Sequence, residues 1–147
     1  MSLEGYEQLK LENQLCFPLY ATAKEVVRKY KPFLDELDLT YTQYITMIVL
    51  WDKESLNVKE LGSMLYLDSG TLTPLLKKLE AKGYITRTRC KEDERNLIIS
   101  ITEKGDALKE KAAAIPNQMI DKWLNISEEE IKTMYHALYK LLSQTQS

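Results

Sequence analysis

Apolar side chains recur at helical spacing in two neighbouring segments near the middle of the chain. In residues 58–67 they form one stripe, made of Val58, Leu61, Met64 and Leu65. After the polar break Asp68-Ser69-Gly70, a second apolar face is formed by Leu72, Leu75, Leu76 and Leu79. Because Pro74 lacks a backbone donor, we expect the second helix to begin shortly before it, capped by Ser69, Gly70 or Thr71, and to end at Gly83. The pattern therefore predicts two helices joined by a tight turn.

The next segments alternate with the period of a strand. Residues 85–90 and 97–102 each place apolar or long side chains at every second position. The loop between them, Lys-Glu-Asp-Glu-Arg-Asn at 91–96, is too polar to be buried. A helix, a turn, a second helix and a basic hairpin follow one another in the order of a winged helix-turn-helix, which reads double-stranded DNA.

Hydroxyls and cations lie where such a fold would meet DNA. The helix outside the leucine face carries short hydroxyls and lysines, and Arg95 in the loop is suited to a minor groove, with Asp93 holding its guanidinium. The candidate DNA-binding residues are Asp68, Ser69, Thr71, Thr73, Lys77, Lys78, Arg87, Arg89, Asp93 and Arg95. Between residues 77 and 91 the cations Lys77, Lys78, Lys82, Arg87, Arg89 and Lys91 face the single acid Glu80, whereas the whole chain has a formal charge of −2. The alternative is a charged face that only contacts water.

The flanking segments are helical in pattern. Helices are expected at 13–37, 41–51, 103–115 and 128–142, and Ser127 with Glu130 forms a capping box for the last. We expect one domain over 1–147, with a winged helix at 41–102 and dimerisation helices at 6–37 and 103–147, the nearest approach to a boundary being the Ala-rich stretch 112–119. The expected fold class is mainly α with a small β-hairpin wing (α+β). A two-fold dimer would place two recognition helices about 34 Å apart, matching a pseudo-palindromic site.

Composition narrows the functional classes. The 147 residues are 44% hydrophobic and 29% charged, with no apolar run of membrane-spanning length and no signal-peptide core, so we expect a cytoplasmic protein without a membrane partner. The two cysteines, Cys16 and Cys90, form neither a disulfide framework nor a CxxC motif. His136 is the single histidine, and no HExxH, P-loop or GxGxxG motif is present. We therefore expect no metal, no cofactor and no enzymatic activity.

Cys16 is the candidate for chemistry. If Asn13 caps the first helix, Cys16 lies in its first turn, where free amides and the helix dipole favour a thiolate, the form that peroxides oxidise. Tyr20 is one turn away on the same face. Tyr30 is fourteen residues further along, about 21 Å at the helical rise, so it can meet a Cys16 only from a partner subunit. The alternative is that Cys16 is a small buried apolar residue.

The chain resembles the MarR family of dimeric winged-helix regulators, and within it the organic-hydroperoxide repressors. The resemblance spans nearly the whole length and rests on LENQLCFPLY, LDLTYTQYITMIVLW, LYLDSGTLTPLLKKLEAKG and DERNLIISIT. It implies a repressor that loses DNA affinity when Cys16 is oxidised. It also implies that Tyr30 and Tyr41 of one subunit donate hydrogen bonds to Cys16 of the other.

Three positions depart from that family. Pro18 replaces a residue more usual near the start of the first helix, and Cys90 stands where most relatives have no cysteine. The stretch Met119-Ile120-Asp121-Lys122 lacks the second cysteine that some members carry before the last helix. We therefore expect no intersubunit disulfide. A sulfenic acid on Cys16 would instead be trapped by a low-molecular-weight thiol or cyclise onto a backbone nitrogen.

The expected function is thus a homodimeric DNA-binding repressor with an organic hydroperoxide as inducer. Two alternatives share its DNA-binding residues: a regulator that responds to phenolic small molecules, and a broader redox-responsive regulator. A thiol peroxidase is a further class, but it needs a resolving partner that this sequence does not offer.

Overall fold

The computed structural model describes residues 1–93 and 95–145, and the chain divides into two compact units, Met1–Ala113 and Ala114–Ser147. The boundary falls inside the Ala-rich stretch 112–119 that the sequence singled out. The helices of the first unit are η1 (Glu7–Leu9), η2 (Leu11–Asn13), α1 (Cys16–Asp35), α2 (Tyr41–Lys53), α3 (Val58–Leu65), α4 (Ser69–Ala81) and α5 (Glu103–Ala112). Its strands are β1 (Ser55–Asn57), β2 (Ile85–Arg89) and β3 (Leu97–Ile101), and the second unit contains α6 (Ile115–Trp123) and α7 (Glu128–Ser143). The expected class, mainly helical with a small β wing, is confirmed.

Helix α1 starts two residues later than the expected Asn13 cap would place it. Leu15 occupies the N-cap without a side-chain hydrogen bond, whereas the Asn13 amide donates to the carbonyl oxygen of Glu7 at 2.7 Å. The predicted cap is therefore wrong, because Asn13 is already used by the preceding 3₁₀ turns. Cys16 is nevertheless the first residue of α1, as its expected place in the first turn requires. Pro18 fits there, since a first-turn residue needs no intrahelical donor.

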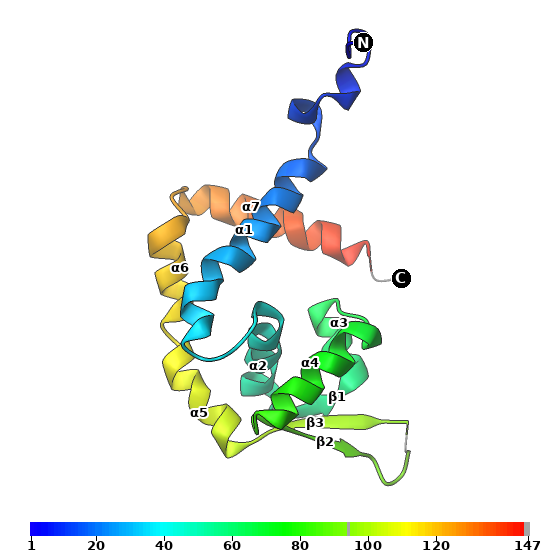
Figure 1. Ribbon diagram of the computed structural model, residues 1–147, viewed down its shortest axis with the longest axis vertical. Coiled ribbons are helices and arrows are strands. Elements are labelled where there is room, and N and C mark those ends of the chain that lie inside the picture. Colours follow the sequence, from blue (N-terminus) through cyan, green and yellow to red (C-terminus); the bar gives the residue numbers. More distant parts are fainter. Residues whose placement is uncertain (94, 146–147) are drawn as a thin grey trace. The chain divides into compact units, whose positions relative to one another are not determined.

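Helix α2 is the centre of the core. Thr40 and Gln43 form a capping box at its start: the Thr40 hydroxyl accepts from the Gln43 N–H at 3.3 Å, and the Gln43 side chain accepts from the Thr40 N–H at 3.0 Å. Met47 and Leu50 have no exposed surface. The helix packs against α1, α3, α4 and α5, and Figure 1 shows α2, α3 and α4 gathered on one side of the sheet. This packing fixes the direction of α4.

The helix-turn-helix is present, with two corrections. Helix α3 ends at Leu65 instead of residue 67, because Tyr66 adopts a left-handed conformation with φ of 55°. The cap of α4 is Asp68, whose carboxylate accepts from the Thr71 N–H at 2.8 Å, so the expected cap at Ser69, Gly70 or Thr71 is wrong. The predicted apolar face is confirmed, since its four leucines are buried: Leu72, Leu75, Leu76 and Leu79.

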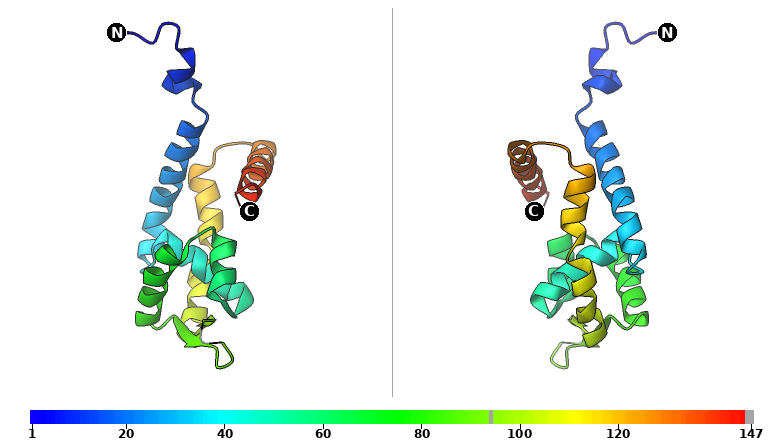
Figure 2. Two further views of the ribbon diagram at one scale, coloured as in Figure 1. Left: turned by 90° about the vertical axis from the view of Figure 1, so that its right-hand side faces the viewer. Right: turned by 90° about the vertical axis from the view of Figure 1, so that its left-hand side faces the viewer.

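The predicted hairpin is confirmed, and it is joined by a strand that the sequence did not reveal. The sheet has the order β1-β3-β2, with Leu56 opposite Ile99 and Arg87 opposite Ile99 on the other side. Strand β1 contains only Ser-Leu-Asn, too short to show an alternation. The loop between β2 and β3 comprises residues 90–96, and we call it the wing loop. Its described residues, 90–93 and 95–96, extend away from α2, α3 and α4 (Figure 2).

The helix predicted over 103–115 ends at Ala112 as α5, and a further helix that the sequence did not predict, α6, follows from Ile115 to Trp123. Pro116 lies in the first turn of α6, and because it has no N–H it cannot donate to the carbonyl of Ala112 as a continuous helix requires. Helix α7 is confirmed, with the Ser127 and Glu130 capping box in place. The two hydrogen bonds from Ser127 also lower the pKa of the Glu130 carboxyl.

A tight junction holds α5 against the first strand of the wing. The Trp51 indole donates to the carbonyl oxygen of Gly105 at 3.0 Å, and the Thr102 hydroxyl donates to the carbonyl oxygen of Gly83 at 2.6 Å. A Cβ atom on Gly105 would lie 2.2 Å from the carbonyl oxygen of Tyr84. Since that neighbour is backbone, it cannot move aside cheaply.

We predict that Gly105→Ala lowers the free energy of unfolding by about 2–4 kcal/mol, the cost of forcing two backbone segments apart. Urea denaturation measures the change. Gly70→Ala is the matched control, because a Cβ there meets only the Asp68 carboxylate oxygen within 4 Å, at 3.3 Å. Equal losses from the two substitutions would contradict this junction.

Candidate DNA-binding surface and redox site

The outer face of α4 presents most of the predicted groups. Thr71, Thr73, Lys77 and Lys78 are exposed, on the side opposite the buried leucines. The Thr73 hydroxyl donates to the Ser69 carbonyl oxygen at 2.8 Å, which leaves its oxygen free to accept. Asp68 is committed to capping, so its carboxylate positions the first turn. This face can offer hydroxyls and ammonium groups to a groove.

The wing loop carries Arg95 as an exposed side chain. Asp93 accepts a hydrogen bond from the backbone N–H of Arg95 at 3.0 Å, and the Asn96 N–H donates to the Asp93 carbonyl oxygen at 2.9 Å. Asp93 thus shapes the loop backbone. The sequence predicted an ion pair between its carboxylate and the Arg95 guanidinium, but no such pair forms within residues 1–93 and 95–145. Glu94, counted in the predicted loop, lies outside the described residues.

A hollow of about 290 Å³ lies beside the wing loop. Asp93, Arg95 and Asn96 line it from the loop, and Asn57 and Lys59 line it from the start of α3. Lys59 was not predicted from the sequence, because Arg95, which lines the same hollow, is 36 residues away in the chain. Its position beside Arg95 adds a cation to the wing.

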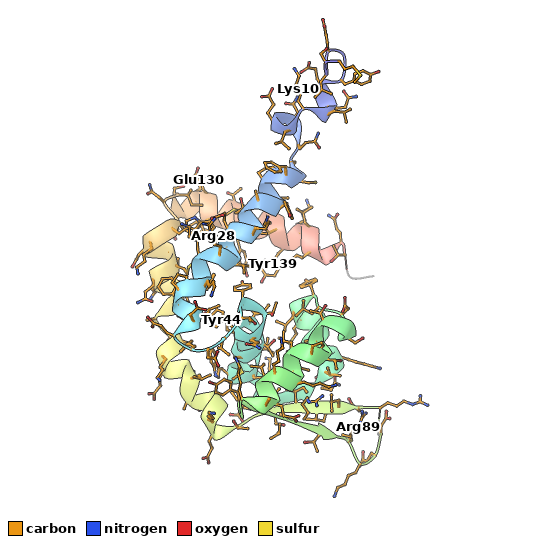
Figure 3. All side chains as sticks on the ribbon, viewed as in Figure 1. Lys10, Arg28, Tyr44, Arg89, Glu130 and Tyr139 are labelled. Atoms are coloured by element: carbon orange, nitrogen blue, oxygen red, sulfur yellow. The ribbon has the colours of Figure 1, made fainter. Side chains whose placement is uncertain are left out.

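Two of the predicted surface cations are only partly exposed, because each is paired with an acid of the same chain. Arg87 is paired with Glu80 at 3.2 Å, and its side chain is only 21% exposed. The Lys82 ammonium donates to the backbone carbonyl of Asp38 and lies 3.3 Å from the Asp38 carboxylate. The local positive excess is therefore smaller than the sequence indicated. Four of the six cations between residues 77 and 91 are exposed: Lys77, Lys78, Arg89 and Lys91. Arg89 lies at the end of β2 (Figure 3).

An aromatic cluster joins α1 to the start of α2. The ring centroids of Tyr30 and Tyr41 are 5.1 Å apart, and that of Tyr44 lies 5.7 Å from that of Tyr30. Tyr44 is labelled in Figure 3. Burial raises the pKa of Tyr30. Burial, then the neighbouring Tyr30 and Tyr41, raises the pKa of Tyr44 to about 12. These two phenols are therefore protonated at neutral pH and can act as hydrogen-bond donors.

Cys16 is an exposed free cysteine at the opposite end of α1. Tyr20 is also exposed, at 62%, and the Lys24 ammonium lies 5.2 Å from the centre of its ring. Because α1 is continuous from Cys16 to Asp35, Tyr30 of the same chain is about 21 Å away. One subunit thus brings Tyr30 and Tyr41 together and leaves Cys16 apart from both.

Other kinds of site find no support in the part of the chain that the structure describes. No group of three or more His, Cys, Asp and Glu side chains there could hold a metal ion, and His136 packs edge-on against Tyr135, with ring centroids 5.9 Å apart. No described helix combines the length and apolar character needed to cross a bilayer.

The fold and surface define a winged-helix regulator of the DNA-binding class. Residues 28–112 match the family model described as transcriptional regulator SarA/Rot. The organic hydroperoxide resistance transcriptional regulator of Bacillus subtilis is 52% identical over 137 residues, covering 93% of this chain and 92% of that protein. The chain belongs to the SarA/Rot family of transcriptional regulators.

Solved structures agree with this assignment. Reduced AbfR bound to DNA, a protein of Staphylococcus epidermidis, matches with a TM-score of 0.79 and 31% identity over 97% of this chain and 99% of that one. A mutant MarR of Escherichia coli in complex with operator DNA matches with a TM-score of 0.78 and 25% identity, covering 87% and 93% of the two chains. The predicted resemblance to the MarR family is confirmed.

The tyrosine cluster gives a prediction in alkaline solution. The folded state binds the Tyr44 proton more tightly than the unfolded state, so its contribution to stability is present below pH 10 and is lost as pH rises towards about 12. Ultraviolet titration of tyrosinate should show a late step that Tyr44→Phe removes. Tyr6→Phe, the matched control, changes an exposed tyrosine outside this cluster and should leave the late step in place. A late step that persists in Tyr44→Phe would contradict the assignment.

Proposed function

We propose that this protein is a homodimeric repressor that binds a pseudo-palindromic double-stranded operator and releases it when an organic hydroperoxide oxidises Cys16. The observation that carries the proposal is the arrangement along α1: an exposed thiol at its start and two tyrosines gathered near its end. The likeness to a Bacillus regulator of organic hydroperoxide resistance supports the choice of inducer. In this role the protein is a regulator and not an enzyme, and its cytoplasmic location stays a prediction.

Dimerisation is supported by exposed apolar side chains on α1 and, separately, on α7. Leu15, the N-cap of α1, is 75% exposed, and Phe17 and Val27 on α1 are 45% and 47% exposed. On α7, Met134, Tyr135, Leu138, Tyr139 and Leu141 are each at least 38% exposed. Exposed apolar side chains of this kind favour association. A second copy would also bring a Tyr30 and Tyr41 pair within reach of Cys16, which α1 of the same chain cannot do.

The proposed chemistry is a two-electron oxidation of sulfur. The Cys16 thiolate attacks the terminal oxygen of the hydroperoxide; an S–O bond forms, the O–O bond breaks, and the departing alkoxide takes a proton to become an alcohol. A low-molecular-weight thiol then condenses with the sulfenic acid, giving a mixed disulfide and water. The partner's Tyr30 and Tyr41, with Tyr20 of the same chain, surround the sulfur and donate to its anion. The added oxygen or thiol displaces them.

Displacement of Tyr41 has a direct route to the DNA-reading helix. Tyr41 is the first residue of α2, directly after the Thr40 cap. The Gln43 side chain completes that cap, and its oxygen also lies 3.5 Å from the ammonium of Lys82, at the end of α4. A shift of the start of α2 therefore moves Gln43, and through its contact with Lys82 the shift reaches the end of α4. Movement of α4 in each subunit changes the spacing of the two reading heads.

A regulator of phenolic small molecules remains a second candidate, because one hollow fits such a ligand. It has a volume of about 390 Å³, and its lining combines apolar side chains, three cations, one carboxylate, one hydroxyl and one phenol: Val27, Leu34, Leu39, Lys24, Arg28, Lys31, Asp35, Thr40 and Tyr41. Of the cations, Lys31 is already paired with Asp35 at 2.8 Å. An aromatic acid could place its ring on the apolar wall and its carboxylate near the cations. Release of DNA by an aromatic acid, with no response to hydroperoxide, would favour this candidate.

For DNA binding, we predict that Arg95→Ala weakens operator binding by about 1–3 kcal/mol while the dimer stays folded, since one oriented groove contact is lost. Lys77→Ala should instead weaken binding to all duplexes and flatten the dependence of affinity on salt. Fluorescence anisotropy across a salt titration separates the two effects. Unchanged affinity of Arg95→Ala at every salt concentration would refute the role of the wing loop.

For sensing, we predict that Cys16→Ser binds operator but ignores organic hydroperoxide, because a serine hydroxyl cannot form a sulfenic acid. Cys90→Ser, the matched control, should still release DNA. A gel-shift titration with hydroperoxide, with and without a small thiol, gives the readout. If only Cys90→Ser fails to respond, the sensor is wrongly assigned; if both fail, a disulfide between the two cysteines replaces the single-cysteine mechanism.

A further inference from the structure

Glu80 makes two contacts with one residue of the wing. It lies in the last turn of α4, and Arg87 lies in the middle of β2. One Glu80 oxygen accepts from the backbone N–H of Arg87 at 3.2 Å, and the other accepts from a terminal guanidinium nitrogen of Arg87 at 3.2 Å. The carboxylate therefore holds both the strand and the side chain of Arg87.

The position of β2 in the sheet explains the backbone contact. Strand β2 is at an edge, with β3 as its single neighbour in the order β1-β3-β2. Ladder hydrogen bonds run from Thr102 to Tyr84 and from Cys90 to Asn96, so even-numbered residues of β2 face β3. The N–H of Arg87 consequently points away from the sheet, where an edge strand has no backbone partner. Glu80 supplies that partner from the recognition helix.

The Glu80–Arg87 ion pair is not expected to add much to the stability of the fold. The Nε atom of Arg87 is buried and has no hydrogen-bond partner among the described residues, so the guanidinium is partly desolvated and incompletely satisfied. A buried, incompletely bonded charge costs free energy, and such pairs are often no more stable than apolar replacements. What the pair provides is a fixed geometry between α4 and β2.

We propose that Glu80 and Arg87 are positioning residues that set the angle between the recognition helix and the wing, so that both engage one DNA duplex together. This inference rests on the proposed DNA-binding function. It assigns Arg87 to holding the strand, whereas the sequence analysis placed it among the DNA contacts. Loss of the pair lets the wing move relative to α4, which weakens binding to a specific site more than binding to any duplex.

The test uses a duplex that the reduced wild-type protein selects from a randomised pool, and a random-sequence duplex for comparison. Glu80→Gln keeps the size of the side chain and removes its charge. Glu110→Gln, at an exposed position on α5, makes the same change in net charge elsewhere. We expect Glu80→Gln to bind the selected duplex about three- to tenfold more weakly than Glu110→Gln, with random-duplex binding equal in the two and with parallel salt slopes.

Arg87→Met and the double variant complete a mutant cycle. If the two residues act as a unit, Arg87→Met lowers selected-duplex affinity to a similar extent, and the double variant loses no more than either single variant. Equal selected-duplex binding by Glu80→Gln and Glu110→Gln would overturn the proposal. Tighter binding by Glu80→Gln with a steeper salt slope would also overturn it, because Arg87 would then be a phosphate contact that Glu80 restrains.

Hydrogen exchange without DNA keeps the pair testable apart from the proposed function. The Arg87 amide should exchange faster in full-length Glu80→Gln than in the wild type, while α3 is unchanged. Equal exchange of the Arg87 amide in both would overturn the anchoring of β2. If the wild type selects no duplex, the proposed function fails and the positioning role with it; if it selects one and Glu80→Gln is unaffected, only the positioning role fails.

Discussion

The length of helix α1 is the constraint on which the account of this protein depends. A continuous helix runs from Cys16 to Asp35, and its rise places the thiol about 21 Å from Tyr30 of the same chain. The aromatic cluster at its other end joins α1 to α2, and α2 in turn supports α3, α4 and α5. The thiol and the tyrosines therefore serve one site only if a second copy supplies one of them. The proposed sensing of hydroperoxide therefore requires a dimer.

Charged side chains near the end of α4 connect this helix to its neighbours. Glu80 reaches forward to β2, while Lys82 reaches back to Asp38 and Gln43 before α2 and in its first turn. The outer face of α4 keeps its hydroxyls and lysines exposed. One short helix thus combines a surface for DNA with two intramolecular contacts. Through these contacts the start of α2 and the wing both influence the direction in which α4 points.

Local patterns in the sequence were enough to predict several elements. The leucine face of α4, the two hairpin strands and the capping box of α7 depend on residues a few positions apart, and all three are confirmed. The cap of α4 was placed one to three residues too late, at Ser69, Gly70 or Thr71, because several neighbouring residues there are suitable caps and the choice of Asp68 depends on backbone angles. Strand β1 was missed because its pairing partner is 45 residues away in the chain.

In the candidate sites, too, local patterns could be predicted from the sequence, whereas contacts between distant residues could not. Cys16 and the tyrosines were found from helical spacing and from the family resemblance. The inward direction of Lys82 and Arg87 was not, because their acidic partners become neighbours only in the folded chain, with Asp38 being 44 residues from Lys82. A count of charges along the sequence treats every lysine and arginine as exposed. In the folded chain, Lys82 and Arg87 instead form ion pairs with Asp38 and Glu80.

The most direct test of the central claim, that the tyrosines act across the dimer, uses a mixed dimer. One subunit carries Cys16→Ser with its tyrosines intact, and the other retains Cys16 but carries Tyr30→Phe and Tyr41→Phe. The rate at which organic hydroperoxide oxidises the single remaining Cys16 is then measured by trapping the sulfenic acid. The account predicts the rate of one wild-type site, since intact tyrosines face that thiol from the partner. The slow rate of a dimer with both tyrosine pairs changed would contradict it.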